Sequence, residues 1–261
     1  MILDRIVEAK REELVARKRA VPQRELQRRC RDLGASRDFE AALRPIPPNP
    51  VRLVAEVKKA SPSRGVLAAG MDPVALACRY AEAGAAALSV LTDAPFFHGE
   101  LEDLAAVRRA VTLPILRKDF ILEEYQLWES RAWGADAILL IVAILEPGAL
   151  RDLRQAAKGL GLAALVEVHT REELERALDS GATIVGVNNR DLRSFTTLLD
   201  PSLDLLPLIP PGIVRVSESG LFTRADVLNV VQAGAHAVLV GEALVRSQNI
   251  QAKVRELALL D

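Results

Sequence analysis

One short pattern recurs four times along this 261-residue chain: a helical segment, a glycine, a turn and a strand-like apolar run. The four copies are EAGAAALSVL from Glu82, WGADAILLIV from Trp133, SGATIVGV from Ser180 and AGAHAVLV from Ala233. Their glycines fit the left-handed position just past a helix end, where a residue without Cβ costs least. Further apolar runs begin at Leu53, Ile115, Ala163 and Ile213. The pattern therefore predicts eight strands alternating with helices.

The spacing and character of these runs predict the fold. Strands separated by helices pair in parallel, and near-continuous apolar strands are buried on both faces. Eight units in about 210 residues favour a closed (β/α)8 TIM barrel. An open doubly wound sheet is the alternative, but no GxGxxG follows the first strand. The length also allows two smaller domains, although no low-complexity linker divides the chain.

The first 48 residues precede the first strand, so we expect a helical extension over 1–48 and a barrel over 49–261. Apolar residues from Ile2 to Val15 fall on one face of a first helix, with charges opposite. A second helix is expected from Gln23 to Leu33. Two placements stay open: the extension closes the bottom of the barrel, or it packs over the top and helps enclose a substrate.

Composition limits the classes of function. Charged residues make up 26% of the chain and the net charge is −1, which gives no electrostatic case for a nucleic acid or an anionic membrane. The longest apolar run, Ala137 to Leu145, is too short to span a bilayer. Cys30 and Cys78 lack metal or redox spacing, which suits a reducing cytoplasm. The three histidines form no HxH or HxxxH pair, so no metal is expected.

Polar residues stand at the ends of most of the predicted strands. They are Glu56, Lys58, Lys118, Glu167, Asn188, Arg190 and Glu218. The carboxyl ends of barrel strands meet at one face, where active sites of this fold lie. A structural ion pair would explain Glu56 and Lys58 alone equally well. Two lysines and several glutamates around one cavity, however, can supply an acid, a base and an anion clamp.

Two glycine-containing loops predict a phosphate site. SESG, with Ser219 and Gly220, follows the seventh strand, and VGEAL, with Gly241 and Glu242, follows the eighth. Small residues let backbone N–H groups approach an anion, and loops seven and eight are where phosphate sites recur in this fold. Ser61 and Ser63, after the first strand, are further donors. Tight turns alone would explain either glycine taken singly.

The chain resembles the indole-3-glycerol-phosphate synthase family in an ordered series of motifs. These are AEVKKASPSRG, FFHGELEDL, LPILRKDFI, LVEVHT, VGVNNRDL, VSESGL and VLVGEAL, and ILDRIVEAKREEL resembles the family's N-terminal helices. The resemblance covers essentially the whole chain. It implies ring closure of 1-(2-carboxyphenylamino)-1-deoxyribulose 5-phosphate to indole-3-glycerol phosphate, carbon dioxide and water, a carboxy-lyase step of tryptophan biosynthesis. It also implies a small phosphorylated substrate, no cofactor and no metal.

Roles for single residues come from the same resemblance. Lys118 is implied as general acid and Glu167 as general base, while Lys58 holds the substrate carboxylate and Glu56 orients the lysines. Asn188 and Glu218 position the hydroxyls and the anthranilate part. Ser61, Ser219, Gly220, Gly241 and Glu242 belong to the phosphate end. The aromatic pocket is implied to be walled by Pro62, Phe97, Phe120, Leu139, Arg190 and Leu239.

Two other functions remain possible from the residues. A phosphate-binding barrel such as a sugar-phosphate isomerase would share loops seven and eight, and a non-catalytic barrel would bind phosphates or a protein. We expect a monomer or weak homo-oligomer in the cytoplasm.

Overall fold

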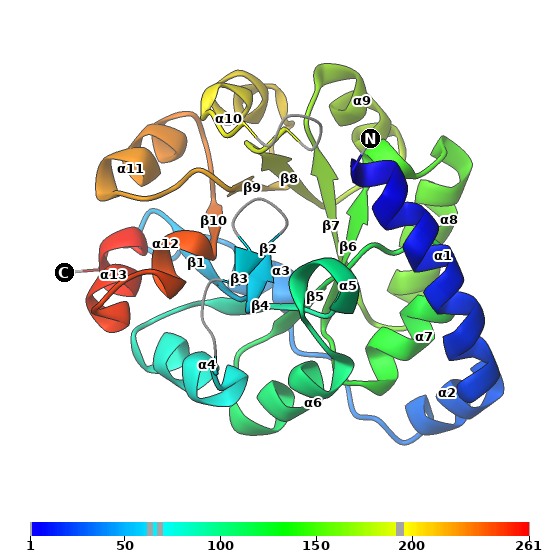
Figure 1. Ribbon diagram of the computed structural model, residues 1–261. Coiled ribbons are helices and arrows are strands. Elements are labelled where there is room, and N and C mark those ends of the chain that lie inside the picture. Colours follow the sequence, from blue (N-terminus) through cyan, green and yellow to red (C-terminus); the bar gives the residue numbers. More distant parts are fainter. Residues whose placement is uncertain (1, 62–64, 67–69, 192–195, 261) are drawn as a thin grey trace.

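A computed structural model describes residues 2–61, 65–66, 70–191 and 196–260. Eight parallel strands close into a barrel in the order β1-β10-β9-β8-β7-β6-β5-β4, so the predicted (β/α)8 TIM barrel is confirmed (Figure 1). The barrel strands are β1 (Arg52–Val57), β4 (Ala87–Leu91), β5 (Ile115–Lys118), β6 (Ala137–Ile141), β7 (Ala163–Val168), β8 (Ile184–Asn188), β9 (Val214–Glu218) and β10 (Ala237–Val240).

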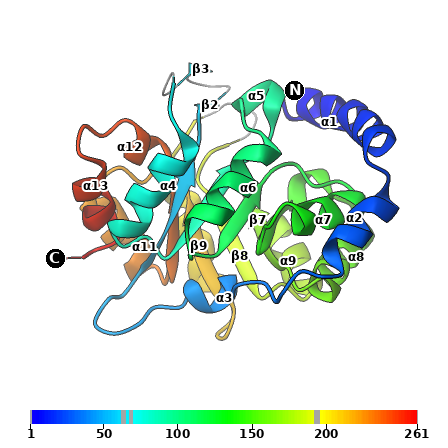
Figure 2. The ribbon, with the colours of Figure 1, turned by 90° about the horizontal axis from the view of Figure 1, so that it is seen from below.

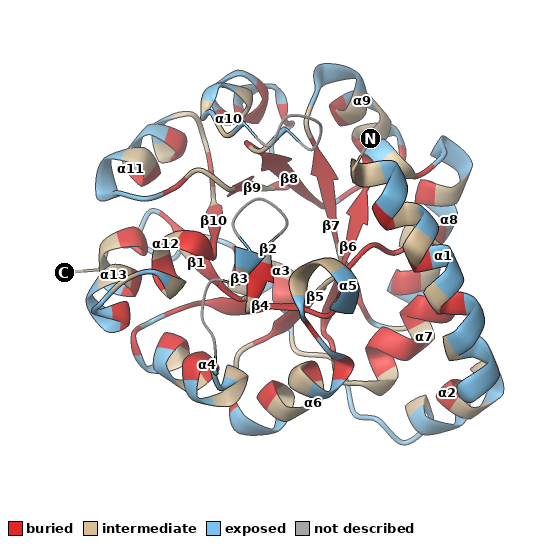
Figure 3. Ribbon diagram, viewed as in Figure 1, coloured by how far each residue is buried: buried red, intermediate tan, exposed pale blue. Residues whose placement is uncertain are grey.

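Helices form the outer ring and cover the strands from solvent. The ring consists of α4 (Pro73–Glu82), α6 (Leu101–Ala110), α7 (Tyr125–Ala132), α8 (Pro147–Gly159), α9 (Arg171–Asp179), α10 (Asp200–Leu205), α11 (Arg224–Gln232) and α13 (Ile250–Leu257). Short helical segments α5 (Ala94–Phe97), η1 (Val142–Ile144), η2 (Leu206–Leu208) and α12 (Glu242–Val245) lie in the loops. Figure 3 shows the buried strands inside helices whose outer faces are exposed. This burial is the reason that the strands read as continuous apolar runs.

The four glycines of the repeat adopt the backbone conformation that the sequence predicts. Gly84, Gly134, Gly181 and Gly234 have φ values of 102°, 92°, 81° and 102°. Each ends a helix and turns the chain into the next buried strand, since only glycine adopts positive φ without strain.

Two large apolar clusters fill the barrel and its surroundings, and a third, small one joins the first two helices to α7 through Leu14, Leu26 and Tyr125. The larger of the two large clusters lies between the barrel and the helices, and the smaller fills the barrel interior with residues such as Val54, Leu116 and Leu165. Phe39 and Leu43, from α3 (Phe39–Ala42) and its end, close the amino-terminal end of the interior. Figure 2 shows α3 at one end of the barrel, and α5 with the start of α1 at the other.

The N-terminal segment therefore divides between the two placements that the sequence left open. Helix α1 (Ile2–Ala20) brings Ile2, Leu3 and Ile6 to the mouth of the barrel, while α3 closes the opposite end. Helix α2 (Gln23–Cys30) is shorter than predicted, because the Leu33 N–H bonds the Cys30 carbonyl in a turn that ends it. The domain boundary at residue 48 stays a prediction.

One small element was not predicted. Strands β2 (Ala60–Ser61) and β3 (Gly65–Val66) pair antiparallel in the loop after β1. Each has two residues, too few to give a period-2 pattern in the sequence.

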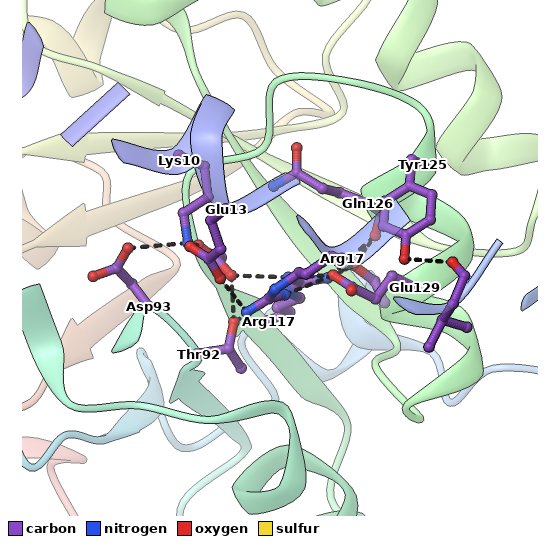
Figure 4. A network of polar contacts seen from close by, with 12 residues as sticks. Lys10, Glu13, Arg17, Thr92, Asp93, Arg117, Tyr125, Gln126 and Glu129 are labelled. Atoms are coloured by element: carbon purple, nitrogen blue, oxygen red, sulfur yellow. Dashed lines mark hydrogen bonds and ion pairs between the residues drawn. The ribbon is translucent and has the colours of Figure 1, made fainter. Parts of the chain in front are cut away.

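A buried ionic network holds α1 against the barrel (Figure 4). The Lys10 ammonium lies 3.0 Å from Asp93 and 2.9 Å from Asp119, and all three side chains are at most 1% exposed. Arg117 of β5 is fully buried and pairs with Asp119 at 2.9 Å and with Glu129 of α7 at 2.8 Å. Buried charges are tolerated only when they are paired in this way. The network thus joins α1 to the strand that ends in Lys118.

Candidate active site

A cavity of about 1090 Å³, counted out to its open mouth, lies at the carboxyl ends of the barrel strands. The structure brings fifteen of the predicted site residues together around it: Glu56, Lys58, Phe97, Lys118, Phe120, Leu139, Glu167, Asn188, Arg190, Glu218, Ser219, Gly220, Leu239, Gly241 and Glu242. Ser61 lies in β2, and Pro62 and Ser63 fall outside the described residues.

Lys118 is the central cation of this cavity. Its Nζ lies 3.2 Å from Glu167 Oε2 and 3.4 Å from Glu218 Oε2, which come from strands β7 and β9. Burial lowers the pKa of Lys118, but the carboxylates of Glu167, Glu218 and Glu56 outweigh it and hold that pKa well above its usual range. The ammonium is therefore charged, and it can donate a proton only to a group whose basicity rises during a reaction.

Glu218 is the carboxyl group in this cavity whose pKa is raised. Burial, together with the nearby charges of Glu167 and Glu56, raises its pKa to about 8 although Lys118 acts in the opposite direction. Gly186 on the neighbouring strand makes room for it, because a Cβ there would lie 2.1 Å from Glu218 Oε1. No local pattern points to Gly186, because the clash is between side chains of different strands.

Glu56 and Lys58 point to the same side of β1 and its end, as their spacing predicts. Lys58 Nζ lies 2.6 Å from Glu56 Oε1. Burial raises the pKa of Glu56, but Lys58 and Lys118 lower it by more, so the group stays ionised. A Cβ on Gly241 would lie 2.4 Å from Glu56 Oε1, so this glycine leaves space for the carboxylate.

Glu167 is buried at the end of β7, with 2% of its side chain exposed. Burial raises its pKa, but Lys118, His169 and a hydrogen bond from Asn188 lower it below the usual value. His169, two residues further on, has its Nε2 atom 3.6 Å from Glu167 Oε1. Glu167 is thus an ionised carboxylate that lies between the Lys118 ammonium and the His169 imidazole. A carboxyl group must be ionised to accept a proton.

The loops after β9 and β10 form the end of the cavity predicted for phosphate. Ser219 and Gly220 have φ values of 66° and 77°, two consecutive left-handed residues. The Asn189 side chain donates a hydrogen bond to the Ser219 carbonyl at 3.0 Å and fixes this turn. Gly241 caps α12, and Arg190 pairs with Glu242 at 3.4 Å across the loop. The glycines at these two loops leave the backbone open to close approach by an anion, as the sequence predicts for a phosphate site.

The opposite wall is apolar. The rings of Phe97 and Phe120 lie 6.2 Å apart between centroids, with planes inclined by 37°. Ten lining residues were not predicted: Ile2, Leu3, Ile6, Leu91, Asp119, Ile141, Leu221, Phe222, Val240 and Ala243. The first three belong to the apolar face of α1, which the sequence did indicate. Its contact with the cavity depends on long-range packing and has no local signal.

Neither a metal centre nor a membrane-spanning helix is found in the part of the chain that the structure describes. Over residues 2–61, 65–66, 70–191 and 196–260, no three His, Cys, Asp or Glu side chains are grouped so that they could hold a metal ion. Among the described residues, no helix is both long enough and apolar enough to cross a membrane.

Fold and cavity together define a (β/α)8-barrel protein with a charged, apolar-walled site at the carboxyl ends of its strands. The family model described as indole-3-glycerol phosphate synthase matches residues 3–257. The chain belongs to the indole-3-glycerol phosphate synthase family.

Relatives of this name are similar over nearly their whole length. The indole-3-glycerol phosphate synthase of Chlorobaculum tepidum is 50% identical over 95% of this chain and 97% of its own. That of Roseiflexus sp. is 50% identical over 98% of this chain and 97% of its own.

Among solved structures, 3-hexulose-6-phosphate synthase from Salmonella typhimurium has a TM-score of 0.65 at 13% identity, over 80% of this chain and 97% of its own. Thiamine phosphate pyrophosphorylase from Pyrococcus furiosus has a TM-score of 0.59 at 16% identity, over 80% of this chain and 94% of its own. These two likenesses show the fold alone.

Proposed function

We propose that this chain catalyses the ring closure of 1-(2-carboxyphenylamino)-1-deoxyribulose 5-phosphate to indole-3-glycerol phosphate, as a carboxy-lyase of tryptophan biosynthesis. The observation that carries the proposal is Lys118, a charged lysine held between Glu167 and Glu218 in a cavity that has an apolar wall and, at its other end, the loops after β9 and β10. Family membership supports the same reaction. The proposal needs no cofactor or metal. A cytoplasmic location and a monomer or weak homo-oligomer stay predictions.

Lys118 acts as the general acid in this proposal. As the aromatic carbon attacks the substrate carbonyl, the carbonyl oxygen gains negative charge and becomes basic enough to take a proton from the ammonium. Glu167 and Glu218 hold Nζ at 3.2 and 3.4 Å, which favours one orientation of the lysine. Such fixed orientation lowers the cost of reaching the transition state.

Glu167 acts as the general base. After carbon dioxide has left, the former carbonyl oxygen departs as water and one proton is lost as the indole forms. Glu167 is ionised, buried and beside Lys118, so it can take that proton and pass it back to the lysine. Lys58, paired with Glu56 at 2.6 Å, binds the substrate carboxylate and supports departure of the hydroxyl group.

The two ends of the cavity orient the substrate. The phosphate binds at the Ser219–Gly220 turn and at Gly241 and Glu242, in the loops after β9 and β10. Ser61 is assigned to the same end by the family resemblance. Asn188 and Glu218 position the hydroxyls and the ring. Phe97, Phe120, Leu139, Leu239 and Arg190 are assigned to the wall around the aromatic part. Pro62, assigned to the same wall by the resemblance, lies outside the described residues. An apolar wall solvates a carboxylate poorly, which favours its loss as carbon dioxide.

The test is direct formation of product by the purified protein. The chain is mixed with the carboxyphenylamino-deoxyribulose phosphate in the presence of a chelator, and indole absorbance and fluorescence are followed. We expect turnover in the parent and a ~10²- to 10⁴-fold lower kcat in Lys118→Ala and in Glu167→Gln.

Matched controls separate chemistry from folding. Lys59→Ala removes a lysine that pairs with Asp103 at 2.6 Å, and Glu172→Gln changes an exposed carboxylate of α9. Both should keep parental kcat. A folded parent that forms no indole product, or that instead isomerises a ketose phosphate without an aromatic group, would refute the proposed function.

A further inference from the structure

The proposed reaction consumes one proton from solvent in every turnover. The carbonyl oxygen of the substrate takes two protons to leave as water, and one proton is returned when the indole forms. This net uptake of one proton matches the one negative charge that is lost when the substrate carboxylate departs as neutral carbon dioxide. Lys118 and Glu167 can exchange the returned proton across 3.2 Å. The missing proton has to enter from outside before Lys118 can act in the next turnover.

Two side chains behind Glu167 lead away from the substrate. His169 Nε2 lies 3.6 Å from Glu167 Oε1, and His169 Nδ1 lies 3.2 Å from Glu173 Oε2. Glu173 also accepts a hydrogen bond from the His169 backbone N–H at 2.7 Å. This bond holds the Glu173 carboxylate beside Nδ1, on the side of the imidazole ring away from Glu167. With Lys118, these groups form a line of four titratable side chains.

The His169 nitrogen that faces Glu167 is Nε2. Nε2 of His169 is shielded from solvent and has no hydrogen-bond partner in the part of the chain that is described. A buried polar atom without a partner costs free energy, so its position needs a reason. A proton that moves between Nε2 and the Glu167 carboxylate supplies one.

The outer end of the line reaches solvent. His169 and Glu173 line a second, open cavity of about 1710 Å³, counted out to its mouth, on the other side of the strand end. Leu3 and Asn188 line both cavities, so the two are neighbours separated by side chains. Protons can therefore arrive at Glu173 without passing the substrate.

The charges around His169 favour its protonated form. Glu167 of β7, Glu173 of α9 and Glu218 of β9 act on the ring, and Arg176 of α9 lines the same second cavity. Burial lowers the pKa of His169, but the carboxylates outweigh burial and raise it. Because that pKa is raised from a value near neutrality, the imidazole is available as a proton donor at the pH of the cell.

We propose that Glu173 and His169 form a proton-uptake path that reloads Lys118 through Glu167 after each turnover. The imidazolium gives its Nε2 proton to the Glu167 carboxylate, which passes it to Nζ of neutral Lys118 and is ionised again. A turn of the ring brings the emptied nitrogen to the second cavity, where it takes up a proton from solvent, directly or by way of Glu173. His169 is thus a relay residue that acts through Glu167. The inference rests on the proposed function.

The test compares the first turnover with later ones in His169→Ala. The free enzyme begins with Lys118 protonated, so rapid mixing with excess substrate should give about one product per enzyme at the parental rate. Steady-state turnover should then be about tenfold slower, less than the loss of a direct acid or base, because protons still enter by slower routes. Added imidazole should restore the steady-state rate in proportion to its concentration, without changing the first turnover.

Further variants test the same path. His169→Gln fills the space without carrying a proton and should behave like His169→Ala, with similar circular dichroism. Glu173→Gln should also slow only the steady state. His236→Ala, at the amino-terminal end of β10 where the Arg215 N–H bonds it, is the control and should match the parent.

Two results would overturn the relay. One is parental steady-state turnover in both His169 variants. The other is equal slowing of the first and later turnovers with no effect of imidazole, which would mean that His169 only orients Glu167. Either result leaves the proposed function intact if the parent still forms the indole product. A parent without product defeats the proposed function itself.

Discussion

Replacing Lys10 with methionine should destabilise the protein far more than replacing another lysine of the same helix. The Lys10 ammonium is 1% exposed and lies 2.7, 3.0 and 2.9 Å from Glu13, Asp93 and Asp119. Methionine keeps most of the volume but removes the charge. Breaking a buried ion pair costs about 3–5 kcal/mol, because the partner is left as an uncompensated buried charge.

For Lys10→Met, the contacts of the remaining partners indicate a loss of unfolding free energy at the lower end of that range. Asp119 keeps Arg117 at 2.9 Å and the Thr92 hydroxyl at 2.6 Å, and Glu13 is 19% exposed and keeps Arg17. Among the described residues, Asp93 has Lys10 as its only paired cation. We therefore expect about 3 kcal/mol, a fall in Tm of about 6–12 °C for a chain of this size.

The assay is thermal and urea unfolding followed by circular dichroism at pH 7 and again at pH 5. Lys18→Met is the control, since Lys18 is 45% exposed in its pair with Glu123 and such a pair contributes at most ~1 kcal/mol. Losing Lys10 raises the folded-state pKa of Asp93 further above its unfolded value. The loss of stability should therefore grow as pH rises and shrink at pH 5.

A second substitution removes the charge that is left behind. The pair Lys10→Met with Asp93→Asn should recover part of the loss, because the uncompensated carboxylate is gone. If Lys10→Met costs no more than Lys18→Met at pH 7, the ionic network does not hold α1 and the reasoning is wrong.

Two further predictions concern the cavity. Gly241→Ala places a Cβ 2.4 Å from Glu56 Oε1 and 3.1 Å from Glu56 Cβ, so it should displace Glu56 from Lys58 and lower kcat at least about tenfold with little loss of helix content. Gly148→Ala, where a Cβ meets nothing within 4 Å, is the steady-state kinetic control and should keep parental kcat. Glu218→Gln should become steadily more stable relative to the parent as pH rises from 4.5 toward 8. Between these values the unfolded chain has ionised Glu218 while the folded chain, with a pKa of about 8, keeps the proton, so parental stability falls with pH. Equal pH dependence of urea unfolding in parent and variant would contradict this assignment.

Much of the fold could be predicted because its signals are local. Each strand is a buried apolar run, and each of the four repeat glycines sits where a helix must stop. The same local signals fail where elements are short. The two-residue strands β2 and β3 carry no pattern, and α2 ends at Cys30 because of a turn rather than a glycine.

The candidate site could be predicted in outline for a topological reason. Parallel strands with helical crossovers bring all their carboxyl ends to one face, so residues as far apart as Glu56 and Gly241 had to meet once the barrel closed. The residues that form the cavity walls were harder to predict from the sequence than the charged residues at the strand ends. Asp119, Leu91 and Phe222 line the cavity but read as ordinary loop or strand residues in the sequence.

The order of strands and helices, the face on which polar residues gather and the family of the chain could all be inferred from the sequence, because they depend on spacing along the chain. Which charges meet depends instead on how the barrel closes and on where α1 packs. Lys118 lies 3.2 Å from Glu167 and 3.4 Å from Glu218, and Lys10 reaches Asp119 from the first helix. These distances set which carboxyl groups are ionised, since burial and neighbouring charge in three dimensions shift pKa values. Proton chemistry at this site is therefore a property of the folded barrel and not of any one motif.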